Sequence, residues 1–144
     1  MIAESSMTES ADLQSFRAEL RAWLDENFPK ALSRRRQASL DEGAPEDTSE
    51  DARLWAKRMG ARAWGLPTLE KTYGGAGLSP AQAQILREEL GRLNAPNPTA
   101  GMGVGMLAPV LLEFGDEAQK RRFLAPIARG EVRWCQGFSE PGAG

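Results

Sequence analysis

The stretch "YGGAGLSPAQAQILREELGR", residues 73–92, decides the fold class, because it passes from a glycine-rich loop into a clearly marked helix. Ser79 can cap this helix, and Pro80 suits its first position, where the missing proline N–H would be unpaired anyway. Gln82 stands three residues after the cap and can complete a capping box. Apolar residues then recur at helical spacing, at Ile85, Leu86, Leu90 and Leu93. The stretch therefore predicts an amphipathic helix that buries one face.

Helical patterns also fill most of the remaining sequence. We predict helices over residues 12–28, from about residue 48 or 49, over 99–114 with a possible kink at Pro109, and from Asp116 to Gly130. Asp116 and Gln119 repeat the capping box. The expected buried residues of these helices are Leu13, Phe16, Leu20, Trp23 and Leu24, then Leu54, Trp55, Met59 and Trp64, and last Phe123, Leu124 and Ile127. The fold class is therefore all-α, with about five helices.

The pattern changes after Gly130. Residues 131–138, "EVRWCQGF", have the composition and length of a β-strand, but no partner strand lies upstream. Because a lone strand leaves its backbone groups unpaired, we expect this strand to begin a sheet of a second domain, or to pair with another chain. The expected organisation is a flexible tail over 1–10, a helical domain over 11–130, and the truncated start of a second domain over 131–144.

Composition excludes several classes of function. The 144 residues are 41% hydrophobic and carry a net charge of −2, which argues against general nucleic-acid binding. No apolar run approaches the roughly 18 residues that suggest a membrane span. The absence of histidine removes the usual Ser/His/Asp triad and most zinc sites, so no metal site is expected. The single cysteine, Cys135, suits a reducing compartment, and we expect a cytoplasmic protein.

Three motifs could carry chemistry, and each has a plain structural interpretation. The glycines of "GMGVG", residues 101–105, lack the preceding strand of a dinucleotide site, so they either allow close helix packing or leave space for a ligand. Glu88 and Glu89 are expected on a solvated helix face, paired with Arg87 and Arg92, rather than as a catalytic dyad. The segment "FSEPGAG", residues 138–144, is either a turn or a set of hydroxyl and N–H donors for a ligand.

The segment "WCQGFSEPGAG" (134–144), preceded by "GDEAQKRRFLAPIARGE" (115–131) and the opening stretch, resembles the N-terminal part of an acyl-CoA dehydrogenase. The resemblance covers nearly the whole chain after the tail. It implies an orthogonal helical bundle that ends at the first strand of a β-barrel domain not present in this chain. Members of the family bind FAD, remove hydrogens from the α and β carbons of an acyl-CoA, and usually assemble as homotetramers.

The resemblance also implies roles for particular residues. Gln136, Phe138 and Ser139 would lie against the flavin, and Gly144 would belong to the turn that approaches a phosphate of cofactor or substrate. The family often has an aromatic residue in place of Gln136 and threonine in place of Ser139. The glycines of "GMGVG", namely Gly101, Gly103 and Gly105, would widen the deep end of the acyl pocket and admit a long, aromatic or polycyclic acyl group. No catalytic residue is assigned, because the family's glutamate base belongs to the C-terminal domain.

The resemblance leaves two other functions open. The chain could be a noncatalytic helical module for oligomerisation or partner binding, or part of an acyl-CoA oxidase, in which oxygen rather than an electron-transfer flavoprotein reoxidises the flavin. We expect an acyl-CoA dehydrogenase with an electron-transfer flavoprotein as acceptor, assembled as a homo-oligomer, either a dimer or a tetramer. The 144 residues alone are expected to be inactive.

Overall fold

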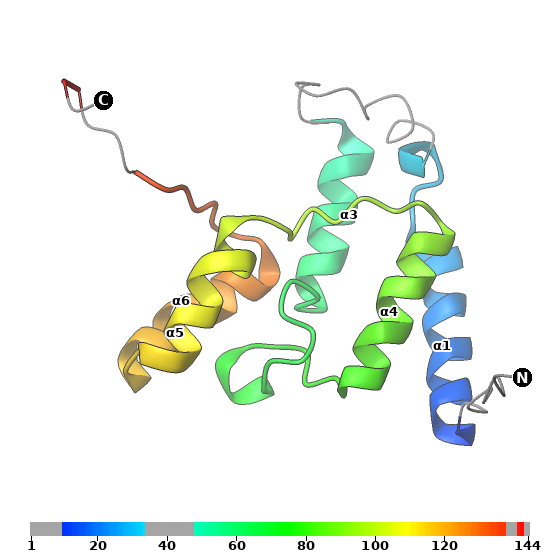
Figure 1. Cartoon of the computed structure of the whole chain (residues 1–144). Helices are drawn as coiled ribbons and strands as arrows, with labels where there is room; N and C mark the ends of the chain where they lie inside the picture. Colours follow the sequence, from blue (N-terminus) through cyan, green and yellow to red (C-terminus); the bar gives the residue numbers. More distant parts are fainter. Residues whose placement is uncertain (1–9, 34–47, 138–140, 143–144) are drawn as a thin grey trace, which may run out of the picture.

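The computed structural model of the chain describes residues 10–33, 48–137 and 141–142 (Figure 1). Helices account for the regular structure of these ranges, so the all-α prediction is confirmed. The elements are α1 (Ala11–Asn27), α3 (Glu50–Ala61), the short 3₁₀ helix η1 (Lys71–Tyr73), α4 (Pro80–Arg92), the π-helical turn η2 (Gly103–Leu107), α5 (Ala108–Phe114) and α6 (Glu117–Arg129). None of the helices within these ranges has both the length and the apolar character needed to cross a membrane.

The predicted helix starts are confirmed by their caps. Ser79 accepts a hydrogen bond from the Gln82 N–H at 3.2 Å, and the Gln82 side chain accepts one from the Ser79 N–H at 2.9 Å. Asp116 and Gln119 form the same reciprocal pair at 2.8 and 3.0 Å. Local sequence determines these helix ends because the capping groups lie within one turn of the N–H groups that they satisfy.

Two apolar clusters organise the helices, which form two groups in Figure 1. One cluster lies among α1, α3 and α4, and the other joins α5, α6 and the loop around Leu69. The buried members of the first cluster are Leu20, Leu24, Phe28, Leu32, Trp55, Met59, Trp64, Ile85, Leu86 and Ala95. The buried members of the second are Leu69, Ala108, Leu111, Leu124 and Ile127.

The turn that follows α3 meets the end of α6 at a glycine contact. The Gly65 N–H donates to the carbonyl oxygen of Ala128 at 3.0 Å, and a Cβ atom on Gly65 would lie 2.6 Å from that oxygen. Real side chains do not tolerate that approach, so glycine is required here. The contact holds the two groups of helices together and thereby positions α6.

The prediction for α3 was partly wrong. Leu54 is 40% exposed rather than buried, whereas Trp55 and Met59 are fully buried. Trp64 is buried as predicted, but it lies beyond the helix, which ends at Ala61. A turn with positive φ at Ala63 brings Trp64 back onto Trp23, with the ring centroids 5.1 Å apart. The helical spacing could not reveal this turn because it depends on packing against α1.

The solvated face predicted for Glu88 and Glu89 was wrong for Glu89, whose side chain is only 2% exposed. Arg21 and Arg92 donate to it at 2.6 to 2.9 Å, and Arg17 donates at 3.3 Å. These contacts, led by the hydrogen bond from Arg21, lower the pKa of the Glu89 carboxyl from 4.5 to about 2. Because three guanidinium groups hold the carboxylate, it joins α1 to α4 and is no candidate proton acceptor.

The helix predicted over 99–114 begins later than expected. The backbone becomes helical at Met102, passes through the π turn η2 and continues as α5. Pro109 is the second residue of α5, which directly follows the π turn, so the irregularity expected near Pro109 is found as the π turn η2. The residues before Met102 are therefore free to form a loop.

Residues 131–137 form no strand, and Figure 1 shows them leaving the bundle beside the end of α6. A strand is defined by hydrogen bonds to a neighbouring strand, and the described ranges contain none to pair with. The described residues 131–137 of the predicted strand thus form none, and the pairing of this segment with another domain stays a prediction.

Candidate functional site

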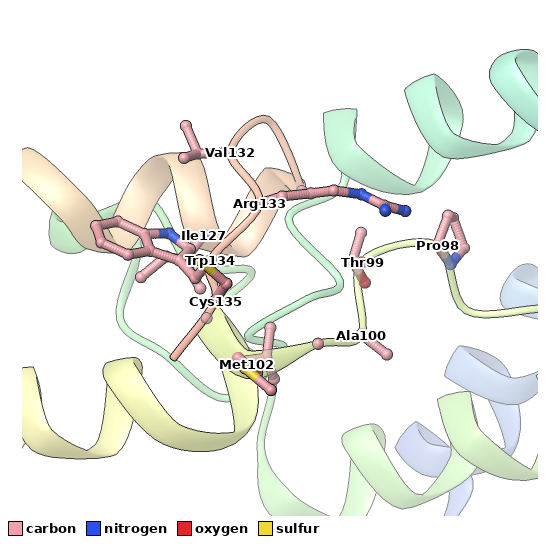
Figure 2. Close-up of a pocket in the computed structure, with 13 residues that line it drawn as sticks. Pro98, Thr99, Ala100, Met102, Ile127, Val132, Arg133, Trp134 and Cys135 are labelled. Atoms are coloured by element: carbon pink, nitrogen blue, oxygen red, sulfur yellow. The ribbon is translucent and has the colours of Figure 1, made fainter. Parts of the chain in front are cut away.

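A cavity of about 360 Å³ lies where the loop before η2 approaches the segment that follows α6 (Figure 2). Residues 98–104 form one wall of the cavity, and residues 132–135 form the other. Ile127 of α6 and Gly130, the C-cap of α6, complete the lining. Two segments about 30 residues apart in the sequence therefore make a single site. Volumes of 300–1,000 Å³ are typical of small-molecule pockets.

The loop wall is held by its own polar residues. The Asn97 side chain accepts hydrogen bonds from the N–H of Thr99 at 3.1 Å and from its hydroxyl at 2.6 Å. Thr99 is only 5% exposed and packs against Gly130, which ends α6 in the left-handed conformation. This turn fixes the loop against α6 and brings the following glycines to the cavity.

The three glycines predicted to widen an acyl pocket have different positions. Gly101 and Gly103 line the cavity, whereas Gly105 is exposed and lies outside the lining. A Cβ atom would meet nothing within 4 Å at Gly101 or Gly105, but at Gly103 it would lie 2.7 Å from the Cδ1 atom of Trp134. Gly101 thus borders open space and Gly103 permits close packing, while the widening of an acyl pocket by these glycines stays a prediction.

Trp134 is the functional candidate that the sequence reasoning missed. It was assigned only to a strand, yet its indole packs edge-to-face on Phe123 at 5.7 Å and lines the cavity. Its Nε1 atom is buried and has no hydrogen-bond partner among the described residues. Trp134 follows the helix-ending Gly130 by only four residues. This short spacing could have indicated that its side chain packs back on the last turns of α6.

The residues predicted to contact a flavin are only partly described. Gln136 is exposed and lies just beyond the cavity wall. Phe138, Ser139 and Gly144 lie outside the described residues. Gln136 thus directly follows a residue of the cavity wall, Cys135, and the flavin contacts of all four residues stay a prediction.

The lining is suited to binding rather than to acid–base chemistry. Its side chains are mainly apolar, and its polar side chains belong to Thr99, Arg133, Trp134 and Cys135. No aspartate or glutamate is among the lining residues in the part of the chain that the structure describes. Nor does that part contain a cluster of side chains able to hold a metal ion. The cavity can accept an apolar group, but its own side chains offer no carboxylate base.

Comparison with known proteins identifies the family of the chain. The family model "Acyl-CoA dehydrogenase, N-terminal domain" matches residues 10–131. The chain belongs to the acyl-CoA dehydrogenase family. The resemblance inferred from the sequence is thereby confirmed, and the helical bundle is the N-terminal domain of this family.

Curated acyl-CoA dehydrogenases from mycobacteria are similar to the chain. Acyl-CoA dehydrogenase IpdE1 of Mycobacterium tuberculosis is 35% identical over 133 residues, which are 92% of this chain and 34% of that protein. Acyl-CoA dehydrogenase FadE26 of the same organism is 37% identical over 87 residues, 60% of this chain and 21% of its own length. The chain thus spans about a third of the length of IpdE1.

Solved structures of the family have the same fold. A "Tcur3481-Tcur3483 steroid ACAD" matches with a TM-score of 0.66 and 32% identity over 95% of this chain and 34% of its own. The ChsE4-ChsE5 complex from Mycobacterium tuberculosis matches with a TM-score of 0.64 and 29% identity over 96% of this chain and 33% of its own. The helical arrangement described above is therefore that of acyl-CoA dehydrogenases.

Proposed function

We propose that the chain is the helical N-terminal part of an FAD-dependent acyl-CoA dehydrogenase that introduces a double bond between the α and β carbons of an acyl-CoA thioester. The observation that carries the proposal is the cavity between Gly101–Gly103 and residues 132–135, in a chain of this family. The second wall runs directly into the residues expected to contact flavin. One segment would therefore contact both the acyl group and the cofactor.

The residues present fit a flavin at the end of this segment. Residues 135–137 are exposed, so their backbone groups and the Gln136 amide are available as donors and acceptors for the edge of a planar ring. Phe138, the Ser139 hydroxyl and Gly144 would extend the same contact. When bound, flavin supplies the acceptor for the hydride that leaves the β carbon. The residues of this chain would hold the flavin ring and the acyl group in the relative position that hydride transfer requires. The base that takes the α proton would come from another part of the complete protein.

The acyl group is proposed to be bulky, with a polycyclic acyl group as the leading candidate. Gly101 leaves open space on the loop wall, and the cavity volume suits more than a short chain. The similar structure titled "Tcur3481-Tcur3483 steroid ACAD" supports the same choice. Each additional methylene buried in such a cavity contributes about 0.8 kcal/mol of binding until the space is filled.

A panel of acyl-CoA substrates tests this function. The complete protein that carries this domain is purified, its flavin is quantified, and turnover with an artificial electron acceptor is compared for polycyclic, long-chain and butanoyl thioesters. We expect bound FAD and the highest kcat/KM for a polycyclic or long acyl group. A sharp preference for butanoyl-CoA would contradict the bulky substrate, and a complete protein without flavin would favour the noncatalytic module. Peroxide formed at the rate of turnover would identify an oxidase in place of transfer to an electron-transfer flavoprotein.

Assembly into an oligomer is a second part of the proposal, favoured by an apolar stripe on the surface. Met102, Met106, Val110 and Phe114 follow one another at intervals of four residues, and each is between 43% and 75% exposed. Such a stripe usually contacts another surface. The similar ChsE4-ChsE5 structure is a complex of two named proteins, so homomeric and heteromeric assembly are both compatible. Light scattering of the complete protein tests this part of the proposal, and a monomer would contradict it.

We also propose that the protein is located in the cytoplasm. Cell fractionation with a tagged protein would test this location.

A further inference from the structure

One side chain of the segment after α6 packs into an apolar cluster. Trp134 is partly buried, whereas residues 131–133 and 135–137 are exposed. Apolar burial therefore contributes to holding this segment chiefly at Trp134.

The indole of Trp134 occupies a seat made by three residues. Phe123 of α6 packs against it with an interplanar angle of 82°, and the two residues belong to the same apolar cluster as Ile127. The backbone of Gly103 also approaches the indole so closely that a Cβ atom would lie 2.7 Å from its Cδ1 atom and 3.5 Å from Ile127. Only glycine at position 103 leaves room for the indole in this place.

The unpaired indole N–H distinguishes this contact from ordinary core packing. Buried polar groups normally find a partner, yet Nε1 of Trp134 has none in the described part of the chain. The described residues therefore leave this donor unpaired, and Figure 2 shows Trp134 beside Cys135 and Ile127 at the cavity.

We propose that Trp134 is a positioning residue, and that its seat on Gly103 sets how the predicted flavin-contacting segment lies relative to the acyl cavity. This inference rests on the proposed function. Gln136 is only two residues beyond Trp134, a distance of at most about 7 Å along the chain, so a displaced indole would displace the flavin contact as well. Gly103 then acts through Trp134, in addition to any space that it leaves for the substrate.

The first experiment tests the seat in the full 144-residue chain, without cofactor or activity. The chain is labelled with 5-fluorotryptophan, and the ¹⁹F resonance of Trp134 is identified by its loss in Trp134→Phe. We expect Gly103→Ala to shift this resonance and leave those of Trp23, Trp55 and Trp64 in place. The matched control is Gly105→Ala in the same turn, where a Cβ meets nothing within 4 Å, and it should shift none of them. An unmoved Trp134 resonance in Gly103→Ala overturns the seat.

The second experiment tests the link to the flavin in the complete protein, through a double-mutant cycle of Gly103→Ala and Trp134→Ala. We expect Gly103→Ala alone to lower the affinity for FAD about tenfold or more, as overpacking energies imply. In the Trp134→Ala background, which has already lost the indole, the same substitution should have no further effect. An equal effect in both backgrounds would show that Gly103 acts without Trp134, and unchanged FAD affinity in all three variants would overturn the link. A wild-type protein that binds no FAD would instead refute the proposed function, while the ¹⁹F result would still decide the seat.

Discussion

Replacing Glu89 with glutamine removes the charge that joins α1 to α4 while preserving the shape of the side chain. The carboxylate receives four hydrogen bonds from three arginines: two from Arg21, one from Arg92 and one from Arg17. A glutamine would keep one acceptor oxygen and turn an NH₂ group toward guanidinium donors. Glu89→Gln therefore loses charge-assisted bonds and adds an unfavourable contact between donors.

The expected loss of stability depends on how deeply Glu89 and its arginine partners are buried. Removing one partner of a fully buried ion pair costs about 3–5 kcal/mol. Here Glu89 is 2% exposed, but the arginine side chains are 27% to 48% exposed and can be hydrated again. We therefore expect Glu89→Gln to lower the free energy of unfolding by about 2–4 kcal/mol.

Urea unfolding of the 144-residue chain, followed by far-UV circular dichroism, measures this loss. The matched control is Glu88→Gln on the adjacent residue, whose side chain is 45% exposed and whose loss should lower the urea midpoint much less. The slope of the free energy with urea should stay constant, so the change appears in the midpoint. Equal midpoints for the two variants would refute the interpretation of Glu89 as the buried link.

Three further predictions concern stability and pH. Because the pKa of Glu89 is lowered from 4.5 to about 2, its contribution of about 1–3 kcal/mol should be complete above pH 4.5 and be lost as the pH falls toward 2; an equally steep decline in Glu89→Gln would contradict this. Ser79→Ala should cost about 1 kcal/mol by removing the cap of α4, whereas Ser79→Thr, measured by the same urea titration, should retain most of it. Gly65→Ala should destabilise the chain by about 1–3 kcal/mol because its Cβ meets the Ala128 carbonyl, and a thermal midpoint equal to that of the open-site control Gly91→Ala would argue against this close contact.

The parts of the fold that sequence could predict are those determined within one helical turn. The capping pairs Ser79–Gln82 and Asp116–Gln119 are confirmed because their donors and acceptors are only three residues apart. The burial of Glu89 was missed because it depends on Arg17 and Arg21, about 70 residues away in the sequence. Arginines four residues apart on one predicted helix are compatible with any acidic partner, so the spacing alone could not select this one.

The candidate site was predicted from one wall only. Two glycines of the motif, Gly101 and Gly103, line the cavity, and their role in widening an acyl pocket stays a prediction. Gly105 fell outside, because the π turn changes the direction of each following residue from that of a regular helix. The role of Trp134 was missed because its contact with Gly103 joins segments about 30 residues apart. The composition around Trp134 also favoured a strand, which gave no reason to expect packing on α6.

Anaerobic reduction of the bound flavin by substrate is the most direct measurement of the proposed function. The complete protein is mixed with a polycyclic acyl-CoA in the absence of any electron acceptor, and the flavin absorbance is followed in a single turnover while the thioester product is analysed by mass spectrometry. We predict bleaching of the oxidised flavin together with a product two hydrogens lighter than the substrate. A protein that contains no flavin, or a flavin that no acyl-CoA reduces, would contradict the assignment of this chain to a working dehydrogenase.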